Sequence, residues 1–146
     1  MINVALLGFG RIGQMHAQNI YLNKTLNLLY VYEKIDKLRK KAKNLYNCKI
    51  EKDYKKIFSD KKVDIIFISS PTNTHIRFIE EGIKYDKTIF CEKPLDLNIN
   101  KIVKTFKNST NFPLSGFKPH ILYMILPLIQ GKSTANGSSA DNLENK

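Results

Sequence analysis

The stretch Gly8-Phe9-Gly10-Arg11-Ile12-Gly13 decides the fold, because it places a G-x-G-x-x-G pattern between a predicted strand and a predicted helix. Residues 2–7 form an apolar run typical of a buried parallel strand. From Arg11 to about residue 24, apolar side chains recur at helical spacing. In such a unit the first glycine permits a tight turn, the second lets the backbone approach a pyrophosphate, and the third lets helix and strand pack closely. The pattern therefore predicts a dinucleotide phosphate site at the start of the helix.

An acidic residue follows at the spacing that a dinucleotide site needs. Glu33 comes 20 residues after Gly13, directly after an apolar run at residues 26–32. A carboxylate at the end of a second strand can bind both ribose hydroxyls of an adenosine. It would also repel the 2′-phosphate of NADP, so the sequence favours NAD, although Lys34 softens that repulsion. The alternative is a glycine turn with an unrelated surface glutamate. The glycine pattern and Glu33 together, at the right spacing, argue against that alternative.

The rest of the chain alternates strand and helix patterns. Short apolar runs predict strands, and amphipathic segments between them predict helices. Such alternation implies an α/β fold in which right-handed helical crossovers join the parallel strands of an open doubly wound sheet. The predicted later strands are 26–32, 48–51, 63–69, 88–92 and 112–117, and the predicted later helices are 35–45, 54–58, 75–84 and 98–106.

The end of the chain breaks this alternation. Residues 121–129 are apolar without a clear period, and residues 131–146 contain mostly Ser, Asn, Gly and Lys. We therefore expect one nucleotide-binding domain over residues 1–117 and a divergent tail over residues 118–146 that is largely disordered. The apolar run is about half as long as a membrane span and contains Pro127, so we predict no membrane helix.

Charge and composition restrict the partners. Lys and Arg together number 24 against 13 Asp and Glu, a net charge of +11 that raises the question of nucleic acid. Only three of the 24 are arginines, whereas nucleic-acid-binding proteins favour the planar, bidentate guanidinium. Lysine, isoleucine and asparagine are abundant and have codons rich in A and T, so a biased genome explains the excess. We expect no nucleic-acid partner.

Cysteine and histidine usage predicts neither a disulfide framework nor a metal site. Cys48 and Cys91 form no C-x-x-C pair, which is typical of a reduced intracellular protein. The N-terminus has no basic region before its first glycine, so we predict no signal peptide and expect a cytoplasmic location. The histidines are too scattered for a metal site. His16 and His120 are expected to be structural or exposed.

Two further loops lie at the carboxyl ends of predicted strands, where open α/β sheets bind ligands. Ser69-Ser70-Pro71-Thr72-Asn73-Thr74-His75 offers neutral polar groups for a ribose or nicotinamide, but a capped turn before a helix explains it equally well. Cys91-Glu92-Lys93-Pro94 offers a lysine that can stabilise developing negative charge, on an X-Pro bond that can be cis. A strand-ending Lys-Pro pair on a lysine-rich surface is the plainer alternative.

Taken together, these motifs resemble those of the Gfo/Idh/MocA oxidoreductases, and within that family the inositol 2-dehydrogenases. The likeness covers roughly residues 1–117 and rests on GFGRIG followed by His16, on Glu33, on SPTNTH at 70–75 and on CEKP at 91–94. It implies an N-terminal Rossmann domain, a larger second domain, and oxidation of a secondary alcohol of a cyclitol or sugar with NAD(P). It also implies that Lys93 is the catalytic lysine beside the nicotinamide. The implied cofactor-binding residues are Gly8, Phe9, Gly10, Arg11, Ile12, Gly13, Glu33, Ser70, Pro71, Thr72, His75, Glu92 and Lys93.

One part of the family pattern is absent from the sequence. Family members are more than twice this length, and their second domain supplies an Asp and a His, three residues apart, that position the substrate and take its proton. This sequence contains no D-x-x-x-H. We therefore expect an NAD-dependent dehydrogenase represented by its cofactor domain, with the second domain missing and the isolated chain nearly inactive. The alternative is a nucleotide-binding module without catalysis, either a decayed fragment or a subunit completed by a partner. Apolar surface left uncovered would favour a homo-oligomer.

Overall fold

Five short apolar segments pair as the strands of one sheet in the computed structural model, which describes residues 1–109. All four pairings are parallel, and the order across the sheet is β3-β2-β1-β4-β5. The chain begins at β1 and builds outward in both directions, which makes β1 the switch point of a doubly wound sheet. The predicted α/β fold is confirmed. The strands are β1 (Ile2–Leu7), β2 (Leu26–Tyr32), β3 (Lys49–Glu51), β4 (Ile65–Ile68) and β5 (Thr88–Cys91).

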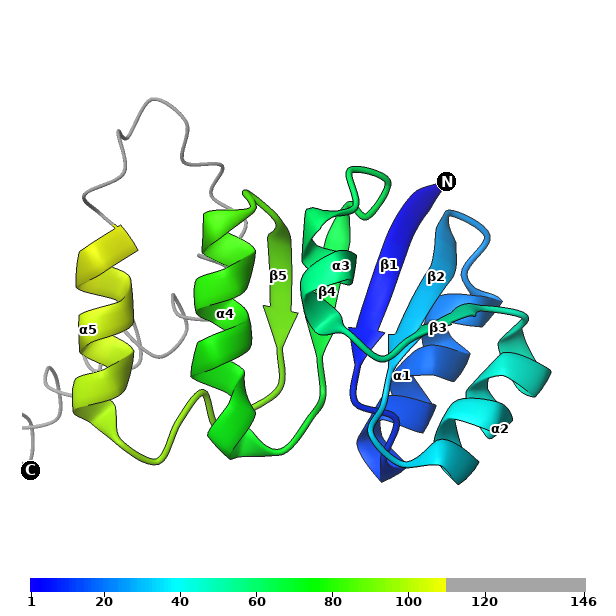
Figure 1. Ribbon diagram of the computed structural model, residues 1–146, viewed down its shortest axis with the longest axis horizontal. Helices are drawn as coiled ribbons and strands as arrows, with labels where there is room; N and C mark the ends of the chain where they lie inside the picture. The colour runs from blue at the N-terminus through cyan, green and yellow to red at the C-terminus, as the bar shows by residue number, and fades with distance from the viewer. Residues whose placement is uncertain (110–146) are drawn as a thin grey trace, which may run out of the picture.

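Helices cover both faces of this sheet. In Figure 1, α1 and α2 lie behind the sheet, whereas α3 and α4 lie in front of it with α5 packed beyond α4. A short 3-10 turn, η1, precedes α4. The alternation of strand and helix along the chain is the one that the sequence predicts. The helical elements are α1 (Arg11–Leu22), α2 (Asp36–Tyr46), α3 (Tyr54–Ser59), η1 (Thr72–Thr74), α4 (His75–Lys84) and α5 (Ile99–Ser109).

The central strand β1 is buried on both of its faces. Val4 and Leu6 belong to the core cluster that includes α1 and α2, and Ala5 and Leu7 belong to the cluster that includes α3 and α4. A continuous apolar run rather than a polar alternation is what a strand between two helical layers requires. Burial of β1 therefore fixes the turn that follows it at the end of the central strand.

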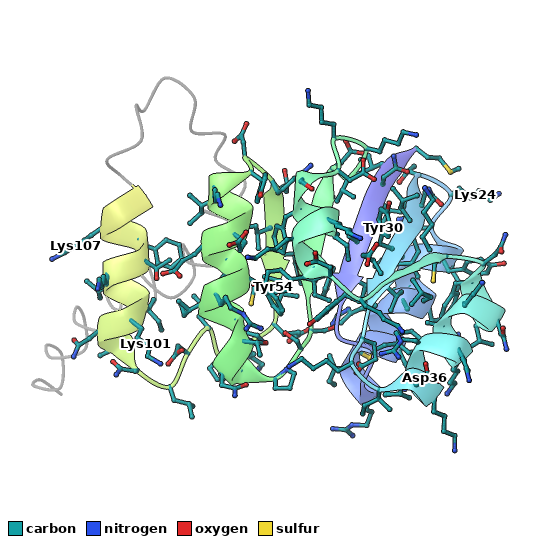
Figure 2. All side chains as sticks on the ribbon, in the orientation of Figure 1. Lys24, Tyr30, Asp36, Tyr54, Lys101 and Lys107 are labelled. Carbon is teal, nitrogen blue, oxygen red and sulfur yellow. The ribbon has the colours of Figure 1, made fainter. Side chains whose placement is uncertain are left out.

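All five parallel strands end at one edge of the sheet, which we call the carboxyl edge. Figure 2 shows Asp36, just after β2, at the lower edge where the strands end, and Lys24, just before β2, at the opposite edge. The loops after β1, β2, β4 and β5 all leave the sheet at the carboxyl edge. These are the loops that the sequence singles out for chemistry.

Element boundaries differ from the predicted ones by a few residues at the ends, where regular hydrogen bonding gives way to turns. The strand predicted at 63–69 is limited to Ile65–Ile68, and the helix predicted at 98–106 continues to Ser109. The predicted strand 112–117 and the predicted tail 118–146 lie outside the described residues. Within residues 1–109, no helix has the length and apolar character needed to cross a membrane.

Candidate functional site

The glycine-rich turn between β1 and α1 is closely packed at two of its three glycines. Gly8 has a positive φ of 98°, and a Cβ added there would lie 2.7 Å from the Cα atom of Ser70. A Cβ on Gly13 would lie 2.2 Å from the carbonyl oxygen of Gly8 and 2.9 Å from Oγ of Ser69. These two positions therefore require glycine for the turn, the helix and the β4 loop to fit together.

Gly10 differs from the other two glycines, because a Cβ built on it would meet nothing within 4 Å. Gly10 is the N-cap residue of α1, and no side chain caps the helix there. The first backbone N–H groups of a helix need an acceptor and attract anions. The open, uncapped N-terminus of this 12-residue helix can bind a pyrophosphate. The residues at the start of α1 therefore fit the dinucleotide that the sequence implies.

The other members of the motif have separate places. Phe9 is fully buried and packs edge-on against Tyr46, with ring centroids 6.1 Å apart. Arg11 and Ile12 are exposed in the first turn of α1. The motif thus combines a buried aromatic anchor with an accessible helix start.

The structure brings Glu33 to the glycine-rich turn. One carboxylate oxygen, Oε2, accepts a hydrogen bond from the backbone N–H of Phe9 at 2.8 Å. The other, Oε1, accepts from the backbone N–H of Ile35 at 2.9 Å. The carboxylate therefore links the loops after β1 and β2, at the position where the sequence analysis expects a ribose-binding group.

Arg39 donates hydrogen bonds to the same loop and was not singled out from the sequence. Its Nη1 atom donates to the carbonyl oxygens of Glu33, at 2.9 Å, and Lys34, at 2.6 Å, and its Nη2 atom donates to Asp36 at 2.8 Å. Hydrogen bonds from Lys40 and then Arg39 lower the pKa of the Asp36 carboxyl. The sequence signal for this contact is the i,i+3 spacing of Asp36 and Arg39 at the start of α2.

The loop after β4 is tied to the glycine-rich turn and to itself. The Ser69 hydroxyl donates to the carbonyl oxygen of Gly8 at 2.9 Å. The hydroxyls of Ser70 and Thr74 lie 2.6 Å apart, and Thr74 also donates to the carbonyl oxygen of Pro71 at 2.7 Å. Pro71 is exposed and Thr72 is half-buried. Polar groups of this loop therefore stand beside the predicted phosphate site.

His75 is the first residue of α4, and its side chain is buried rather than open to a cleft. Its Nδ1 atom lies 2.9 Å from the carbonyl oxygen of Pro94, and its Nε2 atom lies 2.7 Å from that of Ser70. Each ring nitrogen therefore faces a backbone carbonyl oxygen. Any effect of His75 on a ligand at this edge must act through the two loops that it contacts.

The loop after β5 carries Glu92, Lys93 and Pro94. The backbone N–H of Glu92 donates to the carbonyl oxygen of Ile68 at 2.8 Å, which extends the pairing of β5 with β4 to the carboxyl edge. The Lys93–Pro94 peptide bond is cis, as the sequence analysis allows for an X-Pro bond. Lys93 is exposed. It lies at the carboxyl edge, as predicted, together with the glycine-rich turn.

A contact between α1 and the Glu92 loop was missed. Nε2 of His16 lies 2.5 Å from Oε1 of Glu92, and the His16 ring packs on Phe67 with centroids 4.3 Å apart. Phe67 in turn packs on Phe90. The sequence signal is a histidine three residues after Gly13. Its side chain passes over Phe67 of β4 and reaches the end of β5.

Neither cysteine is a candidate nucleophile. Burial raises the pKa of the Cys91 thiol to about 12 and that of the Cys48 thiol to about 11. Both thiols are therefore protonated and unreactive at neutral pH. Within the described part of the chain, no three His, Cys, Asp or Glu side chains are grouped so that they could hold a metal ion.

Comparison with known proteins gives a consistent result. The Gfo/Idh/MocA model, described as an oxidoreductase family with an NAD-binding Rossmann fold, matches residues 2–111. The chain is 31% identical over 121 residues to a myo-inositol 2-dehydrogenase of Thermotoga maritima and 32% identical over 101 residues to an inositol 2-dehydrogenase of Rhizobium meliloti. The first match covers 80% of this chain and 36% of the relative, and the second covers 69% and 30%.

Solved structures extend the likeness to three dimensions. A crystal structure of a myo-inositol dehydrogenase from Corynebacterium glutamicum matches with a TM-score of 0.71 and 28% identity. That match covers 76% of this chain and 33% of the neighbour. The chain therefore spans about a third of the length of the relatives it matches.

Proposed function

Because the chain belongs to the Gfo/Idh/MocA oxidoreductase family, whose N-terminal part is an NAD-binding Rossmann fold, we propose that it is the cofactor-binding part of an NAD-dependent dehydrogenase. The proposed substrate is a secondary alcohol of a cyclitol or sugar, since the curated relatives are named inositol 2-dehydrogenases. The proposed domain is residues 1–117, and the proposed site residues are those that the sequence analysis names.

The observation that carries this proposal is the open space at Gly10 beside the Glu33 carboxylate. A pyrophosphate at Gly10 would accept hydrogen bonds from the first N–H groups of α1 and would face the positive end of the helix dipole. Glu33, which already bonds to the Phe9 N–H, would accept hydrogen bonds from the two hydroxyls of the adenosine ribose. One ligand with a diphosphate next to a ribose satisfies both groups.

A preference for NAD over NADP is supported by two features of the β2 loop. The Glu33 carboxylate would repel a 2′-phosphate at the ribose that it binds. Arg39, the arginine beside this loop, already donates to two backbone carbonyls and to Asp36. Its planar donor fork is therefore engaged within the protein, and a 2′-phosphate would have to compete for it.

Lys93 is proposed as the catalytic lysine. Its exposed ammonium group at the carboxyl edge would donate a hydrogen bond to the substrate hydroxyl or to the nicotinamide ribose. A positive charge there lowers the cost of the negative charge that develops on the substrate oxygen as its proton passes to a base other than the residues named here. When bound, NAD supplies the hydride acceptor at its nicotinamide ring. Glu92, held by His16, would support the shape of this loop.

The decisive experiment is a calorimetric titration of NADH into the purified chain and into Glu33→Ala. Hydrogen bonds to a charged group contribute about 2 kcal/mol, so we expect the variant to bind NADH roughly 30-fold more weakly. The matched control is Glu51→Ala, which removes a carboxylate at the end of β3 that caps its own loop. Equal affinity of the wild type and Glu33→Ala would contradict the assigned ribose contact.

A second candidate function is a nucleotide-binding module without turnover, which the lack of D-x-x-x-H in the sequence favours. Binding of NADH is expected under both functions, so turnover separates them. The chain is mixed with NAD and myo-inositol, and NADH formation is followed by absorbance. A rate well above background supports dehydrogenase activity in this chain, and binding without a rate supports the module.

Location and assembly complete the proposal. Two buried free thiols, Cys48 and Cys91, fit a reducing compartment, so we propose a cytoplasmic protein without a nucleic-acid or membrane partner. Within residues 1–109, β5 is an outer strand of the sheet, and its Phe90 is 42% exposed, although parallel sheets normally bury both faces. Association of copies through this region is the proposed oligomer, and sedimentation of a monomer at all concentrations would contradict it.

A further inference from the structure

One buried histidine joins two loops of the carboxyl edge. His75 is only 1% exposed, and its Nδ1 and Nε2 atoms lie 2.9 Å and 2.7 Å from the carbonyl oxygens of Pro94 and Ser70. Ser70 follows β4, and Pro94 follows Lys93 after β5. The imidazole ring therefore spans the gap between the ends of two neighbouring strands.

The chemistry of these contacts requires an imidazole. A backbone carbonyl oxygen only accepts, so each contact needs a proton on the ring nitrogen that faces it. Either neutral tautomer makes one of the two bonds, and the doubly protonated ring makes both. A residue that served only to fill space here could be phenylalanine. A flat ring with one nitrogen within hydrogen-bonding distance of each carbonyl indicates a residue that sets the separation of two pieces of backbone.

The Lys93–Pro94 turn needs such a support. The N–H of Glu92 is bonded to Ile68, where the pairing with β4 ends. Pro94 has no N–H of its own to donate, and Lys93 is exposed. The bond from His75 to the Pro94 carbonyl therefore anchors the chain immediately after Lys93.

We propose that His75 is a positioning residue for the nicotinamide side of the site, and this inference rests on the proposed function. It holds Lys93 at a defined place relative to the Ser70 loop without touching the ligand. The sheet order puts β4 and β5 on the opposite side of β1 from β2 and Glu33. The His75 bridge therefore acts on the nicotinamide half of the dinucleotide, and the adenosine half depends on Glu33.

The test compares two ligands that share the adenosine and pyrophosphate parts. NADH and ADP are titrated by calorimetry into the wild type, His75→Phe and His75→Gln. Phenylalanine keeps a flat ring but has no donor, whereas glutamine keeps one donor group. We expect NADH affinity to fall roughly tenfold in His75→Phe and less in His75→Gln, while ADP affinity stays within about twofold. If His75→Phe does not fold, His75→Gln alone decides.

A double-mutant cycle with Lys93→Met then asks whether His75 acts through the lysine. Lys93→Met alone should weaken NADH binding, and the His75 substitution should add little in that background, because the turn no longer carries the ammonium group. Additive losses would overturn the proposal. The matched control is Thr105→Val, which removes another buried hydrogen bond to α4, from Thr105 to Glu80 at 2.9 Å, and should leave the ratio of the two affinities unchanged.

The possible failures are distinguishable. Equal losses for NADH and ADP in the His75 variants would mean that the residue is merely structural, and unchanged affinities would mean that it positions nothing. Either result overturns the inference and leaves the proposed function intact. A wild-type chain that binds neither NADH nor ADP would instead contradict the proposed function itself.

Discussion

The Arg39 guanidinium donates a hydrogen bond to the Asp36 carboxylate at 2.8 Å while it also holds the backbone of the β2 loop. Asp36 receives a second cation, since Nζ of Lys40 lies 3.0 Å from its other carboxylate oxygen. The pair is local, one turn apart at the start of α2, and Arg39 also donates to the backbone carbonyl of Glu33. We therefore expect the proposed preference for NAD to depend on which groups of this loop are already engaged.

Releasing Arg39 should admit NADP. In Glu33→Ala the repelling carboxylate is removed, but Arg39 remains paired with Asp36. In the double variant Glu33→Ala/Asp36→Ala the Nη2 atom is released, and we expect NADPH affinity to rise about five- to tenfold above that of Glu33→Ala, since Arg–phosphate pairs are strong. Calorimetry measures both constants. With Glu33→Ala/Glu51→Ala as the matched control, an equal rise in the control would refute this role of Asp36.

Two glycines of the same motif should respond in opposite ways. Gly10→Ala places a methyl group in open space, so we expect a small change of melting temperature but a loss of NADH affinity of at least about tenfold, because the methyl occupies the phosphate cradle. Gly13→Ala forces a Cβ onto the Gly8 carbonyl and should destabilise the fold by about 3 kcal/mol. Urea unfolding and calorimetry separate the two effects. Unimpaired NADH binding by Gly10→Ala would place the phosphate elsewhere.

The buried thiols predict a defined dependence on alkaline pH. Burial raises the pKa of Cys91 from 9.0 to about 12, so the folded state keeps the neutral thiol while the unfolded state ionises first. The stability that this contributes is complete below pH 9.0 and is lost as the pH rises to about 12. We expect iodoacetamide to modify Cys91 at pH 8 only after denaturation in urea. Rapid modification of the folded chain, located by mass spectrometry, would show that Cys91 is accessible.

A lysine far from the carboxyl edge should affect stability and not binding. Nζ of Lys87 donates to the carbonyl oxygens of Asp60, at 2.7 Å, and Val63, at 2.8 Å, and partial burial lowers its pKa. Lys87→Met keeps a long unbranched side chain but leaves both carbonyl oxygens without this donor. We therefore expect the unfolding free energy to fall by roughly 1–2 kcal/mol and the NADH affinity to stay unchanged. The matched control is Lys61→Met, which changes an exposed lysine between Asp60 and Val63. Equal stability of both variants would show that the clamp contributes nothing.

Much of the fold and part of the site follow from short segments of sequence. The turn after β1 has glycines at the positions where a Cβ would clash, and the apolar run Ile2–Leu7 has the composition of a strand covered on both faces. Glu33 was predicted to approach this turn, and its carboxylate does bond to Phe9. These predictions succeed because each depends on one turn or on one strand with its neighbour, for which spacing along the chain is sufficient.

Contacts between distant segments depend on the assembled sheet. His16 and Glu92 are 76 residues apart in sequence and meet because the His16 side chain packs on Phe67 of β4, next to β5. From the sequence, His75 is predicted only to begin a helix. In the structure its ring lies between the carbonyl oxygens of Ser70 and Pro94, because β4 and β5 are neighbours. Residue spacing specifies the turn and the position of Glu33 beside it, since each depends on one strand and its immediate neighbour. Strand order specifies which loops share an edge and which side chains bridge them, because packing of the whole sheet brings those segments within hydrogen-bonding distance.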